Sequence, residues 1–331
     1  PDYGSTDTYS RSYGTLPKSY DSRKLGLITP VRNQNPWGTC WAFGGVSLIE
    51  SEAIRTRRCT LDLSEMWVVR HAYFEKAVKY VRTRGRVAFD QGGEIQDVLW
   101  LVDRYGIVPQ SLYEGGAADG TYDHASLAKA IRRLAKRIVD KKLYEKEHWQ
   151  RMIDEELDRR LGARPDRFVI DGVAYTPFSY ADSIGFRRDD YVALTSFTHH
   201  PFFERFVLEI PDNWAAHATL NIPLDSLMRL LDSALAAGYT AAWDTDVSER
   251  GFGRRAGIAL LPQQEERITL PAPEIVVDQP LRQRMFDTQA TTDDHVMHIV
   301  GTAVDSLGNS YYKVKNSWGE RAGRHGYWYA S

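Results

Sequence analysis

The sequence predicts an α+β fold in which a helical half precedes an antiparallel β-sheet half, with a helical insertion between them. Apolar residues recur at helical spacing through residues 41–105, and two further amphipathic runs lie within residues 114–215. The last third instead holds short apolar or alternating segments bounded by Gly, Pro, Asp or Ser. The chain has 331 residues, 43% of them apolar, which is enough for a substantial core.

We expect four consecutive parts. They are an extended lead-in (1–16), a helical half (17–113), a mainly helical insertion (114–215) and an antiparallel β half (216–331). The lead-in is rich in Tyr, Ser, Gly and Thr without periodicity, and it is too short for an inhibitory pro-domain. No charged-then-apolar leader stands at the start of the sequence.

Three helices are expected in the helical half. The first begins at Cys40, since the apolar residues from Trp41 onward recur at helical spacing. The others are expected at Glu65–Arg82 and Ile95–Tyr105, the latter after a glycine loop. The pair Gly44-Gly45 weakens the first helix and therefore predicts close packing against a bulky neighbour.

The insertion should contain two amphipathic helices. Asp123 can cap the first, and the second should end near Gly162 and Pro165. Their expected inner faces are Leu127, Ile131, Leu134 and Ile138, then Trp149, Ile153 and Leu157. Basic residues gather on the first and acidic residues on the second. Because no stacking aromatics interleave with the basic ones, solvated faces that pair with each other or a neighbouring subunit are favoured over a nucleic-acid patch.

In the β half, strands are expected at Tyr239–Trp243, Ile258–Leu261, Val296–Val304 and Tyr311–Lys315. The last two should form a hairpin through residues 305–310, which include Gly308 and Asn309.

A set of polar residues far apart in the sequence suits nucleophilic acyl transfer. Cys40 at a helix start would form a thiolate stabilised by the helix dipole and by the imidazolium of His295. Asn316 would orient that imidazole, and Trp318 would shield their hydrogen bond from water. The Gln34 side chain and the Cys40 backbone N–H would stabilise the oxyanion. This combination predicts a cysteine peptidase acting through a thioester, without metal or organic cofactor.

Other residues admit simpler interpretations. His298 competes with His295, but three residues apart on a strand the two side chains point to opposite faces. A metal site at Asp293, Asp294 and these histidines is disfavoured because the spacing matches no familiar zinc pattern. His199-His200 is interpreted as a loop pair. A Cys40–Cys59 bridge is disfavoured because the intervening helix would hold the two cysteines too far apart.

The segment Gln34–Phe43 resembles the active-site helix signature of papain-like cysteine peptidases. Asp294-His295 and Asn316-Ser317-Trp318-Gly319 match the family's remaining motifs in type and order. The resemblance implies the papain-like two-subdomain fold. It also implies that Gly92 and Gly93 line the substrate cleft and hydrogen-bond an extended peptide, and that Asp294 and Val296 touch substrate. Of nine tryptophans, Trp41 and Trp318 are expected to support the site.

Several further segments resemble the bleomycin hydrolase and bacterial aminopeptidase C branch: 105–109, 175–177 with the short aromatic helix after it, and 221–225. Trp37 stands where secreted relatives carry a disulfide cysteine. The branch implies a disulfide-poor homohexamer that cleaves peptides as an aminopeptidase because a C-terminal arm occupies part of the cleft. The sequence ends at Ser331, before that arm, so the aminopeptidase preference rests on the resemblance alone.

Peptides are the expected partners, whereas nucleic acid and membrane are not. Net charge is −2, and no run of 18 apolar residues predicts a transmembrane helix. With two cysteines and no expected bridge, a bacterial cytoplasm is favoured, and a periplasmic or exported protein is the alternative if a leader has been removed. The functional alternatives are an endopeptidase or transpeptidase using the same thiol, and a silent papain-like binding protein. The last would be expected to lack one of the four polar site residues, and all four are present.

Overall fold

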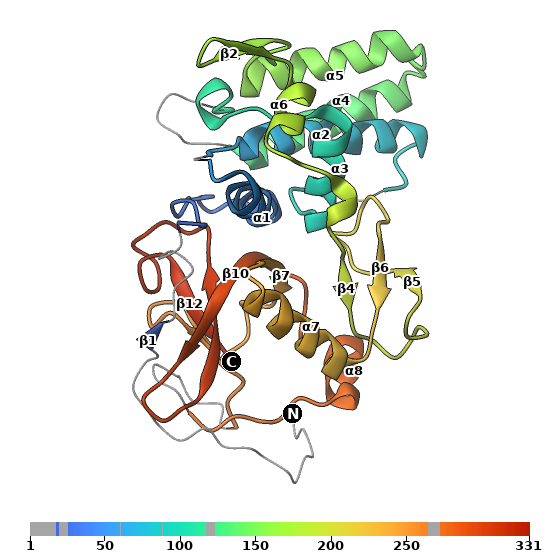
Figure 1. Ribbon diagram of the computed structural model, residues 1–331. Coiled ribbons are helices and arrows are strands. Elements are labelled where there is room, and N and C mark those ends of the chain that lie inside the picture. Colours follow the sequence, from blue (N-terminus) through green and yellow to red (C-terminus); the bar gives the residue numbers. More distant parts are fainter. Residues whose placement is uncertain (1–17, 20–25, 60, 88, 117–122, 264–271) are drawn as a thin grey trace. The chain divides into compact units, whose positions relative to one another are not determined.

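The computed structural model describes residues 18–19, 26–59, 61–87, 89–116, 123–263 and 272–331 (Figure 1). The expected lead-in at residues 1–16 lies outside them. Two compact units form. Unit 1 comprises Pro1–Asn33, Val192–Leu208 and Ala218–Ser331, and unit 2 comprises Gln34–Tyr191 and Glu209–His217. The expected fourfold division of the chain stays a prediction.

Unit 2 is mainly helical, and its three N-terminal helices are confirmed. They are α1 (Cys40–Arg57), α2 (Glu65–Arg82) and α3 (Ile95–Tyr105). Local caps explain two of the starts: the Ser64 hydroxyl accepts the Trp67 N–H, and the Glu94 and Asp97 side chains form a capping box. The predicted close packing of the glycine pair is also confirmed, since a Cβ at Gly45 would lie 2.5 Å from a methyl carbon of Val98 on α3.

The two insertion helices are α4 (His124–Asp140) and α5 (Lys146–Leu161), which lie side by side (Figure 1). Asp123 caps α4 as predicted, by accepting the Ser126 N–H. The expected inner faces are buried except at Leu134, which is half-buried because Ala135 takes the inward position in that turn. The basic side chains of α4 are exposed, as expected of a solvated face.

One buried cation joins α2 to α5. Arg70 is fully buried and donates to Asp154 at 3.0 Å and also to Asp158. Two members of the acidic group on α5 therefore neutralise a core arginine rather than only facing water, which corrects the expectation of a purely solvated acidic face. A lone buried guanidinium would be costly, so we expect these carboxylates to matter for stability more than exposed pairs do.

The rest of unit 2 consists of short elements. They are η2 (Gln110–Leu112), the hairpin β2 (Phe168–Ile170) and β3 (Val173–Tyr175), α6 (Pro177–Ser183) and η3 (Arg188–Asp190). Helix α6 is the short aromatic helix expected after Thr176, whose hydroxyl accepts the Ser179 N–H and so begins the helix.

Unit 1 is built on a seven-stranded sheet with the order β1-β10-β11-β12-β9-β8, and β7 also pairs with β10. The strands are β1 (Lys18–Ser19), β7 (Ala241–Thr245), β8 (Phe252–Gly253), β9 (Ile258–Ala259), β10 (His295–Val304), β11 (Ser310–Lys315) and β12 (Tyr327–Ala330). All pairs are antiparallel except β12 with β9. The predicted β10–β11 hairpin is confirmed, and the Asp305 carboxylate closes its turn on the Leu307 and Asn309 N–H groups.

The strand bounds needed correction at the N-terminal end of β7. The expected strand began at Tyr239, but the Tyr239 N–H bonds the Ala234 carbonyl and Gly238 has φ +87°. These contacts end helix α7 (Leu224–Ala236), which the sequence pattern did not predict. Strand β9 is also shorter than expected, since it stops at Ala259.

Unit 1 also holds a small sheet, ordered β4-β6-β5, and helix α8 (Gln279–Asp287). Its strands are β4 (Leu194–Thr195), β5 (Arg205–Val207) and β6 (Ala218–Asn221). Two glutamines of α8 hold the segment after β4: Gln279 accepts the Ser196 hydroxyl at 2.9 Å, and Gln283 accepts the Thr198 N–H. Within the part of the chain that the structure describes, no helix has the length and apolarity needed to cross a bilayer.

Candidate active site

Cys40 is the first residue of α1, an 18-residue helix. Thr39, fully buried, precedes it, and the Thr39 N–H donates to the Trp37 carbonyl at 2.9 Å. The N-terminal amides of a helix favour negative charge nearby, and that favours the thiolate form of a cysteine at this position. Neither Cys40 nor Cys59 takes part in a disulfide, so the disfavoured bridge between them does not form.

The segment before α1 and the glycine loop are tied together within unit 2. The Gln34 amide donates to the Trp37 carbonyl at 2.6 Å. The Trp41 indole donates to the Gln91 carbonyl at 3.0 Å, and the Gln91 side chain accepts the Gly38 N–H at 3.1 Å. Gln91, the residue before Gly92, thereby bonds to Gly38 and Trp41, which flank Cys40 in the sequence. The expected supporting role of Trp41 in the site stays a prediction.

Gly93 lies directly against Trp41, because a Cβ at this position would be 3.0 Å from the indole ring and from an Asp97 oxygen. A side chain here would therefore need Trp41 or Asp97 to shift by a few tenths of an ångström, so close approach rather than a positive φ favours glycine at this position. The consequence is that the glycine loop has a fixed place beside the first turn of α1.

In unit 1, β10, β11 and the loop after β11 bring His295, Asn316 and Trp318 together. His295 Nε2 and Asn316 Oδ1 are 2.7 Å apart, and both residues are buried. The Trp318 ring lies 4.7 Å from the imidazole and packs on Phe252 and Trp328. Because the asparagine oxygen accepts, Nε2 carries the hydrogen, and proton exchange is left to Nδ1.

Burial lowers the pKa of His295 to about 4. The Asn316 hydrogen bond opposes this effect, and the positive charge of Arg254 adds to it. The Arg254 guanidinium lies over the Trp318 ring, 4.9 Å from its centroid. Sequence reasoning missed Arg254, whose place beside the imidazole depends on the β8–β9 turn.

His298 lies on the same strand but in a different environment. It pairs with Lys315 of β11, is fully buried, and has its pKa lowered by burial and by the Lys315 charge. It lies three positions after His295, so the two side chains leave opposite faces of β10. The predicted role of a packed strand residue suits this position.

The two residues flanking His295 have structural contacts of their own. The Asp294 carboxylate accepts the Val247 N–H at 2.8 Å, and burial raises its pKa. Val296 is 3% exposed. Their expected contacts with substrate stay predictions.

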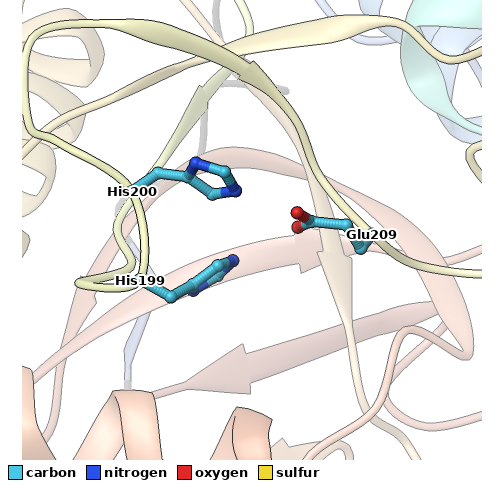
Figure 2. Close-up of side chains that lie close together, drawn as sticks. All are labelled: His199, His200 and Glu209. Atoms are coloured by element: carbon cyan, nitrogen blue, oxygen red, sulfur yellow. The ribbon is translucent and has the colours of Figure 1, made fainter.

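The His199-His200 pair lies in the loop after β4, as the sequence suggested. Figure 2 shows the two rings, together with Glu209, the first residue of the unit 2 segment. The His199 ring stacks on Phe286 of α8, with centroids 5.4 Å apart, and the His200 ring stacks on Phe206 at 4.2 Å. Packing against these two phenylalanines accounts for the positions of both imidazole rings within unit 1. We assign no metal to them.

Two family models match the chain, one to each half. Residues 16–152 match the papain family of cysteine proteases, and residues 170–331 match the peptidase C1-like family. The chain belongs to the papain-like cysteine peptidases. Cys40 belongs to unit 2 and His295 to unit 1. Each distance given above joins two residues of the same unit.

This peptidase is similar along most of its length to bacterial aminopeptidases. It is 24% identical to aminopeptidase C of Lactococcus lactis subsp. cremoris, over 91% of this chain and 77% of the relative. It is 25% identical to aminopeptidase G of Lactobacillus delbrueckii subsp. lactis, over 96% of this chain and 83% of the relative. The crystal structure of PepW from a Lactobacillus strain has the same fold, with a TM-score of 0.68, 19% identity and coverage of 99% of this chain and 79% of that one.

Proposed function

We propose that this peptidase is an aminopeptidase in which Cys40 is the nucleophile and His295 the general acid and base. The observation that carries the proposal is the His295–Asn316 bond of 2.7 Å under Trp318, which fixes the imidazole with Nδ1 as the exchanging nitrogen. Cys40 at the start of α1 supplies the matching thiol. The similarity to aminopeptidases C and G, which covers most of this chain, supports the exopeptidase class.

In the proposed first step, the Cys40 thiolate attacks the carbonyl carbon of the scissile bond. A carbon–sulfur bond forms, and the carbonyl electron pair moves to oxygen. The Cys40 backbone N–H and the Gln34 side-chain amide donate to that oxyanion. The Gln34–Trp37 bond of 2.6 Å holds the amide in a defined orientation.

In the next step, His295 Nδ1 gives its proton to the departing amine, the carbon–nitrogen bond breaks, and a thioester remains on Cys40. His295 then removes a proton from water, which attacks the thioester. The carbon–sulfur bond breaks, the carboxylic product leaves, and the thiolate–imidazolium pair is restored. Asn316 keeps the ring in one orientation throughout.

A pair of fluorogenic peptides that differ only in acetylation of the amino terminus tests the aminopeptidase class. We expect rapid hydrolysis of the free-amine peptide and at least about tenfold slower hydrolysis of the acetylated one. Acetylation removes the charged ammonium group, and the loss of a hydrogen bond to a charged group typically weakens binding by about that factor. Hydrolysis of both at equal rates would instead indicate an endopeptidase. An epoxysuccinyl inhibitor added to a parallel reaction should stop hydrolysis and so exclude a contaminating enzyme of another class.

The pH profile should respond to Arg254. Its charge lowers the pKa of His295, so Arg254→Gln should raise that pKa. In the proposed pair, the negative charge of the Cys40 thiolate raises the pKa of His295 from the value that burial alone sets. The imidazolium must be present to protonate the leaving amine, and activity is therefore lost as pH rises through the apparent pKa of this pair. We expect the alkaline limb of kcat/KM to move to higher pH in Arg254→Gln, and to move less at high salt because Arg254 is exposed.

The adjacent Arg255→Gln is the matched control, since Arg255 is also exposed and is not among the causes of the His295 shift. Thermal unfolding of both variants would show whether loss of the Arg254–Trp318 contact changes packing. A downward move of the alkaline limb in Arg254→Gln would contradict the assigned role of the imidazolium.

A further inference from the structure

A carboxylate from a distant segment lies directly on the glycine loop of unit 2. A Cβ at Gly92 would be 2.0 Å from Asp212 Oδ1 and 2.3 Å from Oδ2, so any side chain at this position would displace the carboxylate. Asp212 is only partly buried. Gly92 is thus the residue that allows a negative charge to lie beside the backbone of this loop.

The segment Glu209–His217 is held firmly in place around Asp212. Asn213 closes the segment on itself, since its side chain accepts the His217 N–H at 2.8 Å and donates to the His217 carbonyl at 3.0 Å. Trp214 is 8% exposed, and its ring lies 6.2 Å from that of Trp100 on α3. Asp212 is therefore carried by an ordered backbone.

A second anchor comes from α3. His217 Nε2 lies 2.9 Å from Oδ1 of Asp97, a fully buried carboxylate whose other oxygen accepts the Glu94 N–H. The His217 ring also packs on Trp100, with centroids 5.7 Å apart. The cap of α3 and the Glu209–His217 segment therefore share one residue, which fixes the segment relative to the glycine loop.

Lys76 of α2 supports the same loop from the buried side. It is 3% exposed, and its ammonium donates to the carbonyl oxygens of Asp90 and Gly92. Burial lowers its pKa, whereas Asp90, Asp97 and Asp212 oppose that change. The ammonium fixes the two carbonyl groups and balances part of the negative charge around the loop.

We propose that the Asp212 carboxylate binds the free α-ammonium group of a peptide whose backbone lies along Gly92 and Gly93, and so selects unblocked amino termini. This rests on the peptidase function proposed above. An ammonium group offers up to three charge-assisted N–H···O bonds, whereas an acetylated terminus is neutral and offers one weaker donor. A peptide that extends past the glycine loop would place its uncharged backbone against Asp212.

The test compares kcat/KM for matched free-amine and acetylated fluorogenic peptides in the full chain and in Asp212→Asn. The variant should lose about ten- to a hundredfold on the free-amine peptide, the usual effect of removing a charged hydrogen-bond partner. It should be unchanged on the acetylated peptide, so the ratio between the two substrates collapses. Equal losses on both peptides, or an unchanged ratio, would overturn the proposal and indicate a purely structural aspartate.

Two further variants sharpen the result. Glu209→Gln removes an exposed carboxylate from the same segment, and Glu209 is not among the residues nearest Gly92. This variant should keep the wild-type ratio of kcat/KM between the free-amine and acetylated peptides. Asp212→Glu keeps the charge on a longer side chain and should restore part of the preference for free-amine peptides. A ratio lowered as much by Glu209→Gln as by Asp212→Asn would mean that only net charge matters.

Binding measurements keep this inference separate from the peptidase function. In Cys40→Ala, calorimetry with the same unlabelled peptides should show tighter binding of the free-amine form, and adding Asp212→Asn should equalise the two. Tight, equal binding of both forms in Cys40→Ala would overturn the role of Asp212 even if turnover is normal. Absence of turnover in the unmodified chain with selective binding intact would instead contradict the peptidase function.

Discussion

Replacement of Cys40 by alanine should abolish peptide hydrolysis while leaving the fold intact. The thiolate forms the covalent bond to substrate, and no other group at the start of α1 can take its place, so kcat should fall by roughly 10⁴-fold or more. Alanine is a favourable helix residue, and Cys40 is only partly buried, so the melting temperature should change by a few degrees at most.

The second cysteine provides the matched control for this experiment. Cys59, like Cys40, is partly buried and in no disulfide, and it lies just beyond the C-terminus of α1. Cys59→Ala should retain wild-type kcat/KM and lose no more stability than Cys40→Ala does. Full activity in Cys40→Ala, or inactivation by Cys59→Ala in folded protein, would contradict the assignment of the nucleophile.

The second large effect is expected at His295, tested against His298 with the same substitution. His295→Gln removes the acid and base of both steps and should lower kcat/KM by roughly 10²–10⁴-fold. His298→Gln should leave activity per folded molecule at the wild-type order, because His298 packs beside Lys315 on the other face of β10.

Stability should not separate the two variants. Both histidines are buried and have lowered pKa values, and glutamine approximates their size without an imidazole. Each variant should lower the melting temperature to a similar extent, so the difference in activity reports chemistry and not folding. If His298→Gln were the inactivating change in well-folded protein, the general base would be wrongly assigned.

Much of unit 2 was predictable because its helices carry local signals. Ser64 caps α2, Asp123 caps α4, and the apolar residues of α5 keep the helical period up to Leu161. Helix α8 was not predicted, although Asp278 caps it by accepting the Leu281 N–H. The helix is short, and Gln279 and Gln283 bond to the loop after β4, so its apolar pattern is weak.

The residues of the candidate site likewise differ in how far local sequence signals predict them. Cys40, His295 and Asn316 stand in short motifs whose residue types already indicate acyl transfer. Arg254 and Asp212 do not, because their importance depends on contacts with Trp318 and Gly92, which are far away in the sequence. Residues such as these, which act through neighbours far away in the sequence, could therefore be identified only from the three-dimensional structure.

Stoichiometric reaction with an epoxysuccinyl inhibitor at neutral pH tests the central claim most directly. A thiolate opens the epoxide ring and leaves a stable adduct, which peptide mass spectrometry can assign to a residue. We expect one adduct per chain on Cys40, none on Cys59, and strongly slowed labelling in His295→Gln because the imidazolium partner is lost. Failure of Cys40 to react in folded protein, or labelling of Cys59 in its place, would contradict a thiolate–imidazolium pair at Cys40 and His295.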